Sequence, residues 1–205
     1  MTIRVHHLRI GRSLFTVWLL EELGLDYELE IYERTELGRA PESLKAAHPL
    51  GKSPVLELDG ITMAESTAIQ LYLVETRDSG GLFTPPASGP ERARFLQWLH
   101  YPEGSAFLPL LLQLLLTRES APKPPVVSAF AAAETSLHLG FIRDGLGDSP
   151  FILGDRLQLP DFGLAYIAAM ADRLGLLGEF PSVKAYAERA MARPAFRRAT
   201  ERTGG

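Results

Sequence analysis

The sequence contains no cysteine, and this absence removes several classes of chemistry at once. Disulfide bonds, thiolate metal sites and a cysteine nucleophile are all excluded. If the protein takes part in thiol chemistry, the thiol must therefore come from a bound small molecule.

The chain also lacks a large excess of one charge and a long apolar run. Its 21 Lys and Arg against 25 Asp and Glu give a formal net charge of -4, whereas a general nucleic-acid binder needs a basic face. The longest apolar stretch, residues 106–116, is too short to cross a bilayer and is interrupted by Pro109. The first residues lack the apolar segment of a signal peptide. We therefore expect a cytoplasmic protein that binds neither nucleic acid nor membrane.

What the sequence does contain is a hairpin motif. Two apolar runs, Val55 to Leu58 and Ile61 to Ala64, are joined by Asp59-Gly60, a dipeptide favoured in tight hairpin turns. Pro54 stands where the first run begins, a position at which its missing N–H costs no ladder hydrogen bond and at which a cis peptide bond is possible. The motif predicts two short antiparallel strands.

The two ends of this hairpin carry polar groups that suit an amino-acid head group. If Pro54 is cis, the backbone of Ser53 faces outward and can pair with an extended ligand. At the far end Glu65-Ser66 precedes a helical run, so N–H groups and a hydroxyl converge where a carboxylate docks, beside a Glu that suits an ammonium. Taken alone, Ser66 is interpreted as a helix cap. Taken with the Lys-Ser-Pro at the other end, it is interpreted as a ligand contact.

The remaining pattern predicts two domains. Residues 1–80 read as strand, helix, strand, short helix, hairpin and helix, which is βαβαββα. The Gly- and Pro-rich residues 81–90 form a linker, and residues 91–205 form an all-helical domain. In that domain Gln158 takes the cap position of a central helix, where it caps weakly, and Asp161 takes the partner position.

The order Ser-Pro-Val, strand, Asp-Gly, strand, Glu-Ser, helix resembles the glutathione-binding half of the cytosolic glutathione transferases. The resemblance implies a thioredoxin-like α/β domain followed by an all-α helical bundle. It implies that Ser53, ahead of a structural cis-proline Pro54, pairs with the cysteinyl unit of glutathione. By the same resemblance Glu65 and Ser66 hold the γ-glutamyl end, and Lys52 lies toward the glycine carboxylate. Glutathione is then the co-substrate, with no metal.

A transferase of this kind must lower the thiol pKa from about 8.5, because only the thiolate attacks well. The segments 98–105 and 18–22 resemble the serine-type bacterial and fungal branch, in which the activating serine stands seven residues before Trp18. Here that position is Gly11. The catalytic candidates are Ser13 and Arg12. The alternative interpretation of Ser13 is an ordinary helix cap, and that of Arg12 is a solvated charge.

Other groups are further candidates for thiol activation or for the walls of the second-substrate site. His7 ends the first strand and is a further candidate donor, as are the backbone N–H groups of residues 11–13. Leu108 and the run Leu111 to Leu116, with Phe107 and Tyr166, are candidate walls for a hydrophobic electrophile. Residues 100–103, His-Tyr-Pro-Glu, border either the cleft or a dimer interface, or are a packed polar cluster.

Three functions compete. The first is a homodimeric glutathione transferase that conjugates glutathione to hydrophobic electrophiles, reduces organic hydroperoxides with it, or does both. The second, motivated by Gly11, is a glutathione or ligand-binding protein of the same fold with little catalysis. The third is a chaperone-like or regulatory interaction module of this fold.

Overall fold

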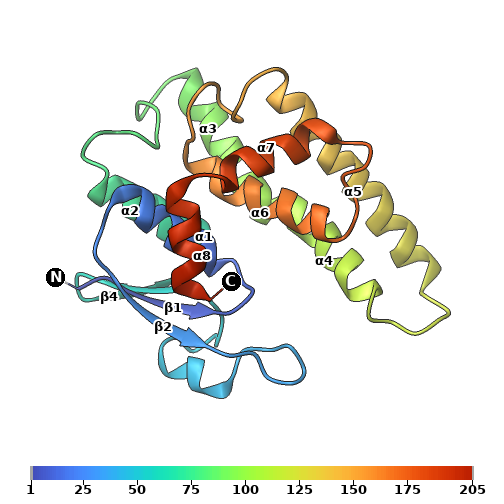
Figure 1. Cartoon of the computed structure of the whole chain (residues 1–205), viewed down its shortest axis with the longest axis horizontal. Coiled ribbons are helices and arrows are strands. Elements are labelled where there is room, and N and C mark those ends of the chain that lie inside the picture. Colours follow the sequence, from blue (N-terminus) through green and yellow to red (C-terminus); the bar gives the residue numbers. More distant parts are fainter. Residues whose placement is uncertain (1, 205) are drawn as a thin grey trace. The chain divides into compact units, whose positions relative to one another are not determined.

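A computed structural model describes residues 2–204, which divide into two compact units (Figure 1). Within the described range, the first unit comprises residues 2–82 with 192–204, and the second comprises residues 83–191. No helix or strand lies between residues 79 and 89, the region in which the linker is predicted. The predicted fold class, an α/β unit followed by a helical one, is confirmed.

The first unit is built on a mixed sheet of four strands in the order β2-β1-β3-β4. β1 (Arg4–Leu8) pairs in parallel with β2 (Glu28–Tyr32), and β3 (Val55–Leu58) runs antiparallel to both β1 and β4 (Ile61–Ala64). The hairpin strands have the predicted bounds. The parallel pair needs a crossover, which α1 (Ser13–Leu23) supplies.

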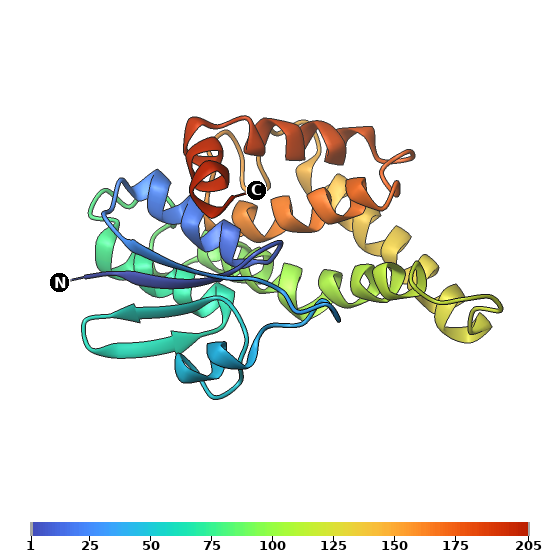
Figure 2. The same ribbon diagram turned by 60° about the horizontal axis from the view of Figure 1, so that its bottom comes forward.

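The two faces of the sheet are covered by different elements. α1 packs on β1 and buries Val17, Trp18 and their apolar neighbours, and it ends at Gly24, whose left-handed φ of 64° is the predicted stop. The opposite face is covered by η1 (Glu42–Ala46), a 3₁₀ turn rather than the predicted α-helical one (Figure 2). Its Leu44 packs against Leu8 and Tyr32.

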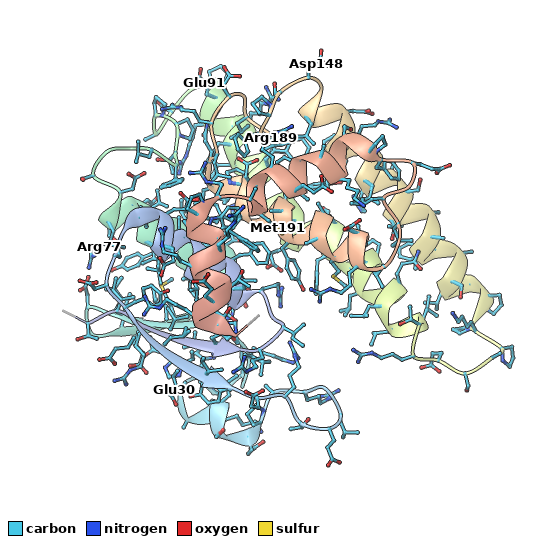
Figure 3. The ribbon with its side chains drawn as sticks, viewed as in Figure 1. Glu30, Arg77, Glu91, Asp148, Arg189 and Met191 are labelled. Atoms are coloured by element: carbon cyan, nitrogen blue, oxygen red, sulfur yellow. The ribbon has the colours of Figure 1, made fainter. Side chains whose placement is uncertain are left out.

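α2 (Ser66–Arg77) completes the predicted βαβαββα order. Its last residue, Arg77, labelled in Figure 3, forms an ion pair with Asp59 of the hairpin turn. This contact ties the end of the helix to the turn between β3 and β4.

The C-terminal helix α8 (Pro194–Thr203) belongs to the first unit, which differs from its predicted place in the second domain. Phe196 lies edge-on to Trp18 of α1 with ring centroids 5.2 Å apart. Arg193 donates to Glu22 at 2.5 and 2.8 Å. The sequence pattern identifies the helix but not the core that it joins, because an amphipathic stripe is satisfied by either unit.

The second unit contains only helices among its named elements. These are α3 (Pro90–Tyr101), η2 (Pro102–Ala106), α4 (Phe107–Leu116), α5 (Pro125–Leu146), α6 (Leu159–Arg173) and α7 (Pro181–Met191). The predicted single bent helix over residues 91–118 is interrupted by a π-helical turn, η2, where Pro102 removes a backbone donor.

The start of α6 is held by a buried carboxylate. Asp161 accepts hydrogen bonds from the N–H groups of Ile152 at 3.0 Å and Gln158 at 2.8 Å, and from the Tyr186 hydroxyl at 2.9 Å. Gln158 Oε1 has no hydrogen-bond partner within residues 2–204. Gln158 and Asp161 therefore occupy the predicted cap and partner positions of this helix.

Candidate functional site

The side chain of Ser53 is used to fasten β3 to β1. Its hydroxyl donates to the carbonyl of His6 at 2.8 Å and accepts from the N–H of Leu8 at 3.0 Å. The bond from Ser53 to Pro54 is cis, as the hairpin motif allowed. Within residues 2–204 the backbone N–H and C=O of Ser53 make no hydrogen bond.

The start of α2 lies at the other end of the hairpin. Glu65 occupies the position before the helix with φ of +75°, a left-handed backbone that non-glycine residues seldom adopt. Its carbonyl accepts from Ile69 at 2.9 Å while its side chain is exposed and makes no cap bond. Ser66 is the first helical residue, so the interpretation of Ser66 as the helix cap is wrong. Lys52 is exposed.

The loop between β1 and α1 explains why residue 11 is glycine. A Cβ built on Gly11 would lie 2.7 Å from the carbonyl oxygen of Leu8, closer than side chains approach backbone atoms. A serine at this position therefore does not fit the loop as it stands. The same Cβ would lie 3.7 Å from the Ser13 hydroxyl, which is the nearest hydroxyl to the place of the expected serine.

Ser13 and His7 form a buried pair behind that loop. The Ser13 hydroxyl lies 2.9 Å from His7 Nδ1, and the two residues are 0% and 1% exposed. Burial, with the nearby charges of Arg9 and Arg34, lowers the pKa of His7 to about 4, so the ring is neutral at pH 7. His7 Nε2 has no partner within residues 2–204. The predicted Ser13 hydroxyl is thus already bonded and faces the interior.

Arg12 stands at the position before α1 with helical backbone angles and is half-buried. Its carbonyl accepts from the N–H of Phe15 at 3.0 Å. The backbone N–H groups of Gly11 and Ser13 make no hydrogen bond anywhere in residues 2–204. The structure therefore brings Arg12, Ser13 and two unpaired N–H groups together where the first strand meets the first helix.

Sequence reasoning missed Arg34, which lies in the segment after β2. Its guanidinium donates to the carbonyls of Arg9, Ile10 and Gly38, each at 2.8 Å. Arg9 in turn donates to the carbonyl of Thr203 at 3.0 Å. No local motif marks Arg34, because its partners are backbone oxygens of a loop that is distant in sequence.

In the second unit the structure supports the packed-cluster interpretation of Tyr101. Its hydroxyl is hydrogen-bonded to His138 Nδ1, and its ring packs edge-on against Trp98 with centroids 5.4 Å apart. Among the candidate walls, Leu116 is buried while Leu108 is 56% exposed. Across residues 2–204, no group of three or more His, Asp or Glu is placed to hold a metal ion.

Comparisons with known proteins agree with the fold. The family model of the glutathione S-transferase N-terminal domain matches residues 1–75. Glutathione S-transferase 3 of Schizosaccharomyces pombe is 31% identical over 97% of this chain and 86% of its own length.

Solved structures match over the whole chain. A glutathione S-transferase from Actinobacillus pleuropneumoniae has 33% identity and a TM-score of 0.90, covering 100% of this chain and 94% of its own. A glutathione transferase homologue from Lodderomyces elongisporus, solved with two glutathione molecules per subunit, has 21% identity and a TM-score of 0.85 over 98% of both chains, which shows a shared fold.

The serine-type branch stays a prediction, since these relatives do not test it. The predicted family does not depend on the branch. The identity shared with a named relative over nearly the full length of both chains, together with the fold, shows that this protein is a member of the glutathione S-transferase family.

Proposed function

We propose that the protein binds glutathione alongside the backbone of Ser53, two residues before β3, and conjugates it to hydrophobic electrophiles, with reduction of organic hydroperoxides as a further use of the same thiolate. The observation that carries the proposal is the Ser53 backbone. Its N–H and C=O have no partner within residues 2–204, and its hydroxyl is used separately in hydrogen bonds to β1. These two groups suit the N–H and C=O of a cysteinyl residue.

The other contacts follow from the charges of the tripeptide. The exposed carboxylate of Glu65 suits the γ-glutamyl ammonium, and the Ser66 hydroxyl with the first N–H groups of α2 suits its carboxylate. Exposed Lys52 suits the glycine carboxylate. Such charge-assisted contacts explain how a flexible tripeptide is held in one extended register.

Thiol activation is assigned to Arg12 and Ser13. Because the Ser13 hydroxyl is buried against neutral His7, Ser13 contributes through its backbone N–H, while the Arg12 charge stabilises the thiolate. An Arg12→Ala variant should therefore raise the pH at which bound glutathione ionises, measured as thiolate absorbance. An unmoved midpoint would remove Arg12 from the mechanism.

Dimerisation and compartment belong to the proposal as well. α5 is long and apolar enough to cross a membrane. This is weak evidence for a membrane span, because helices of soluble proteins also satisfy the same criteria of length and composition. Its exposed apolar residues Val126, Phe130, Leu137 and Phe141 are better explained by contact with a second copy of the chain in a cytoplasmic homodimer. Sedimentation analysis should show a dimer, and a monomer at micromolar concentration would contradict this part.

A second candidate is a glutathione-binding protein with little catalysis. It is favoured by the crowding at Gly11 and by the buried Ser13 hydroxyl, which leave no side-chain hydroxyl at the sulfur. Calorimetric titration with glutathione tests what the two candidates share, and Glu65→Ala is the matched binding-deficient variant.

Turnover separates the two candidates. Rates above background with chlorodinitrobenzene or cumene hydroperoxide support the transferase, and the absence of both rates in a protein that binds glutathione supports the binder. Absence of glutathione binding in the unmodified protein would contradict both.

A further inference from the structure

The guanidinium of Arg34 holds the loop that joins β1 to α1. Nε donates to the carbonyl of Arg9 and Nη2 to the carbonyl of Ile10, both at 2.8 Å, while Nη1 donates to Gly38 at the same distance. A planar guanidinium presents donors in fixed directions and can hold neighbouring carbonyls together. A lysine ammonium carries a similar charge but lacks this fork.

Ile10 shows that the loop conformation is imposed rather than intrinsic. Its φ is +54°, in the left-handed region that a β-branched residue rarely enters. Its side chain is 66% exposed, so core packing does not account for the conformation. The hydrogen bond from Arg34 to the Ile10 carbonyl holds the backbone of Ile10 in this conformation. Strained backbone of this kind is concentrated at functional sites.

The hydrogen bonds from Arg34 to the carbonyls of Arg9 and Ile10, which we call the carbonyl clamp, determine the direction of one N–H group. The carbonyl of Ile10 and the N–H of Gly11 belong to the same peptide bond, which is trans, so the two groups point in opposite directions. Since the carbonyl points to Arg34, the Gly11 N–H points away from it. That N–H makes no hydrogen bond within residues 2–204.

We propose that Arg34 is a positioning residue for thiol activation, which keeps the Gly11 N–H directed at the sulfur of bound glutathione in place of the missing serine hydroxyl. A donor held at the sulfur favours the thiolate over the thiol and so lowers the thiol pKa. The inference rests on the proposed function, because it presupposes that glutathione binds with its sulfur at this loop.

The test compares Arg34→Lys and Arg34→Met with the unmodified protein, and uses Arg4→Met as a control. Arg4 lies at the opposite end of β1, where it forms exposed ion pairs with Glu28 and Glu57. Its replacement by Met removes one positive charge, as Arg34→Met does. Two quantities are measured: the pH midpoint of thiolate absorbance of bound glutathione, and the affinity for S-methylglutathione, which has no thiol to ionise.

Both Arg34 variants should raise the midpoint by about one pH unit, which is about tenfold less thiolate at a pH below both midpoints. Their affinity for S-methylglutathione should stay within about twofold of the unmodified protein, because the contacts of the γ-glutamyl and glycine ends are not altered. The Arg4→Met variant should titrate with the unmodified protein.

Two results would overturn the inference. If Arg34→Lys titrates like the unmodified protein, charge rather than the carbonyl clamp is what matters. If both variants lose S-methylglutathione affinity or fail to fold, Arg34 has a general structural role. If only Arg34→Met fails to fold, the pH midpoint of Arg34→Lys decides alone. A rise of about one pH unit supports the inference, and an unchanged midpoint overturns it. Failure of the unmodified protein to bind glutathione is a separate result, which rejects the proposed function itself.

Discussion

The two ends of the candidate site treat their polar groups in opposite ways. At the end around Ser53 and Glu65, where we propose that the tripeptide binds, the Ser53 backbone groups are unpaired within residues 2–204 and the Glu65 side chain is exposed. At the thiol end, the Ser13 hydroxyl and His7 Nδ1 are buried and bonded to each other, and the carbonyls of the loop are taken up by Arg34. At the first end polar groups are left without a partner among the described residues, whereas at the second end the side-chain hydroxyl is buried and already hydrogen-bonded.

This difference suggests how a transferase fold manages without a catalytic serine. Under the proposed function, binding energy comes from exposed charges that are placed before the ligand arrives, whereas activation depends on the Arg12 charge and on backbone N–H groups whose direction is fixed by other contacts of the loop. Side-chain substitutions should therefore act on affinity at the first end and on stability or thiol ionisation at the second.

The largest expected effect is the pH dependence of stability caused by His7. Its folded-state pKa of about 4 lies below its ordinary 6.5, so the unfolded chain takes up a proton first as the pH falls. The stabilisation is fully present above pH 6.5 and is lost between about pH 6.5 and 4, by up to about 3 kcal/mol. Urea unfolding at a series of pH values measures it.

The His7→Asn variant isolates this contribution. Asp161, whose pKa is raised by burial to about 6, has the opposite sign in part of the same range, but it is present in both proteins and cancels in their difference. The advantage of the unmodified protein should shrink as the pH falls from 7.5 to 4. Parallel stability curves would show that His7 is not buried in its neutral form.

The contrast between the two ends also marks how far sequence reasoning reaches. The hairpin and its flanking residues were predicted to the residue because the motif is contiguous, and turn chemistry and alternation are local properties. The helices of both units were located within a few residues for the same reason. The cap role suggested for Ser66 was wrong because the helix begins one residue earlier than a cap would allow.

What sequence reasoning missed depends on contacts between distant segments. Arg34 acts on carbonyls of the loop ahead of α1, and a backbone acceptor leaves no residue-type signature. The burial of Ser13 against His7 follows from the packing of α1 on β1. The place of α8 follows from its contacts with Trp18 and Glu22. Such choices are made by tertiary packing, which periodicity does not encode.

The next effect concerns the end of the site around Ser53 and Glu65. Replacing Glu65 with Ala should weaken glutathione binding by about 1.5–3 kcal/mol, the loss typical of a charged hydrogen bond. Calorimetric titration measures it. Because the Glu65 side chain makes no cap bond, the free energy of unfolding should change little. Glu75→Ala, on the same helix α2, serves as a control for the lost charge. Unchanged affinity in Glu65→Ala would refute the role assigned to this carboxylate.

A smaller effect is expected when the serine of the predicted serine-type branch is introduced at residue 11. Gly11→Ser should lower the free energy of unfolding by about 1–3 kcal/mol, because its Cβ meets the carbonyl of Leu8 and the loop must shift. Gly11→Ala is the matched control, since it adds the same Cβ without a hydroxyl. Equal destabilisation of both, with no gain in turnover by the serine variant, is the expected outcome. A more active serine variant of unchanged stability would show that the loop is not crowded.

The smallest effect compares the two serines directly. Ser53→Ala removes two hydrogen bonds and Ser13→Ala removes one, at about 1 kcal/mol of stability each, so Ser53→Ala should be the more destabilised by urea unfolding. Because the Ser13 hydroxyl faces His7, the thiolate midpoint of Ser13→Ala should stay within about 0.3 pH units of the unmodified protein. A rise of a full pH unit would instead mean that this hydroxyl reaches the sulfur, so that both ends of the site would present side chains to the ligand and the contrast between them would disappear.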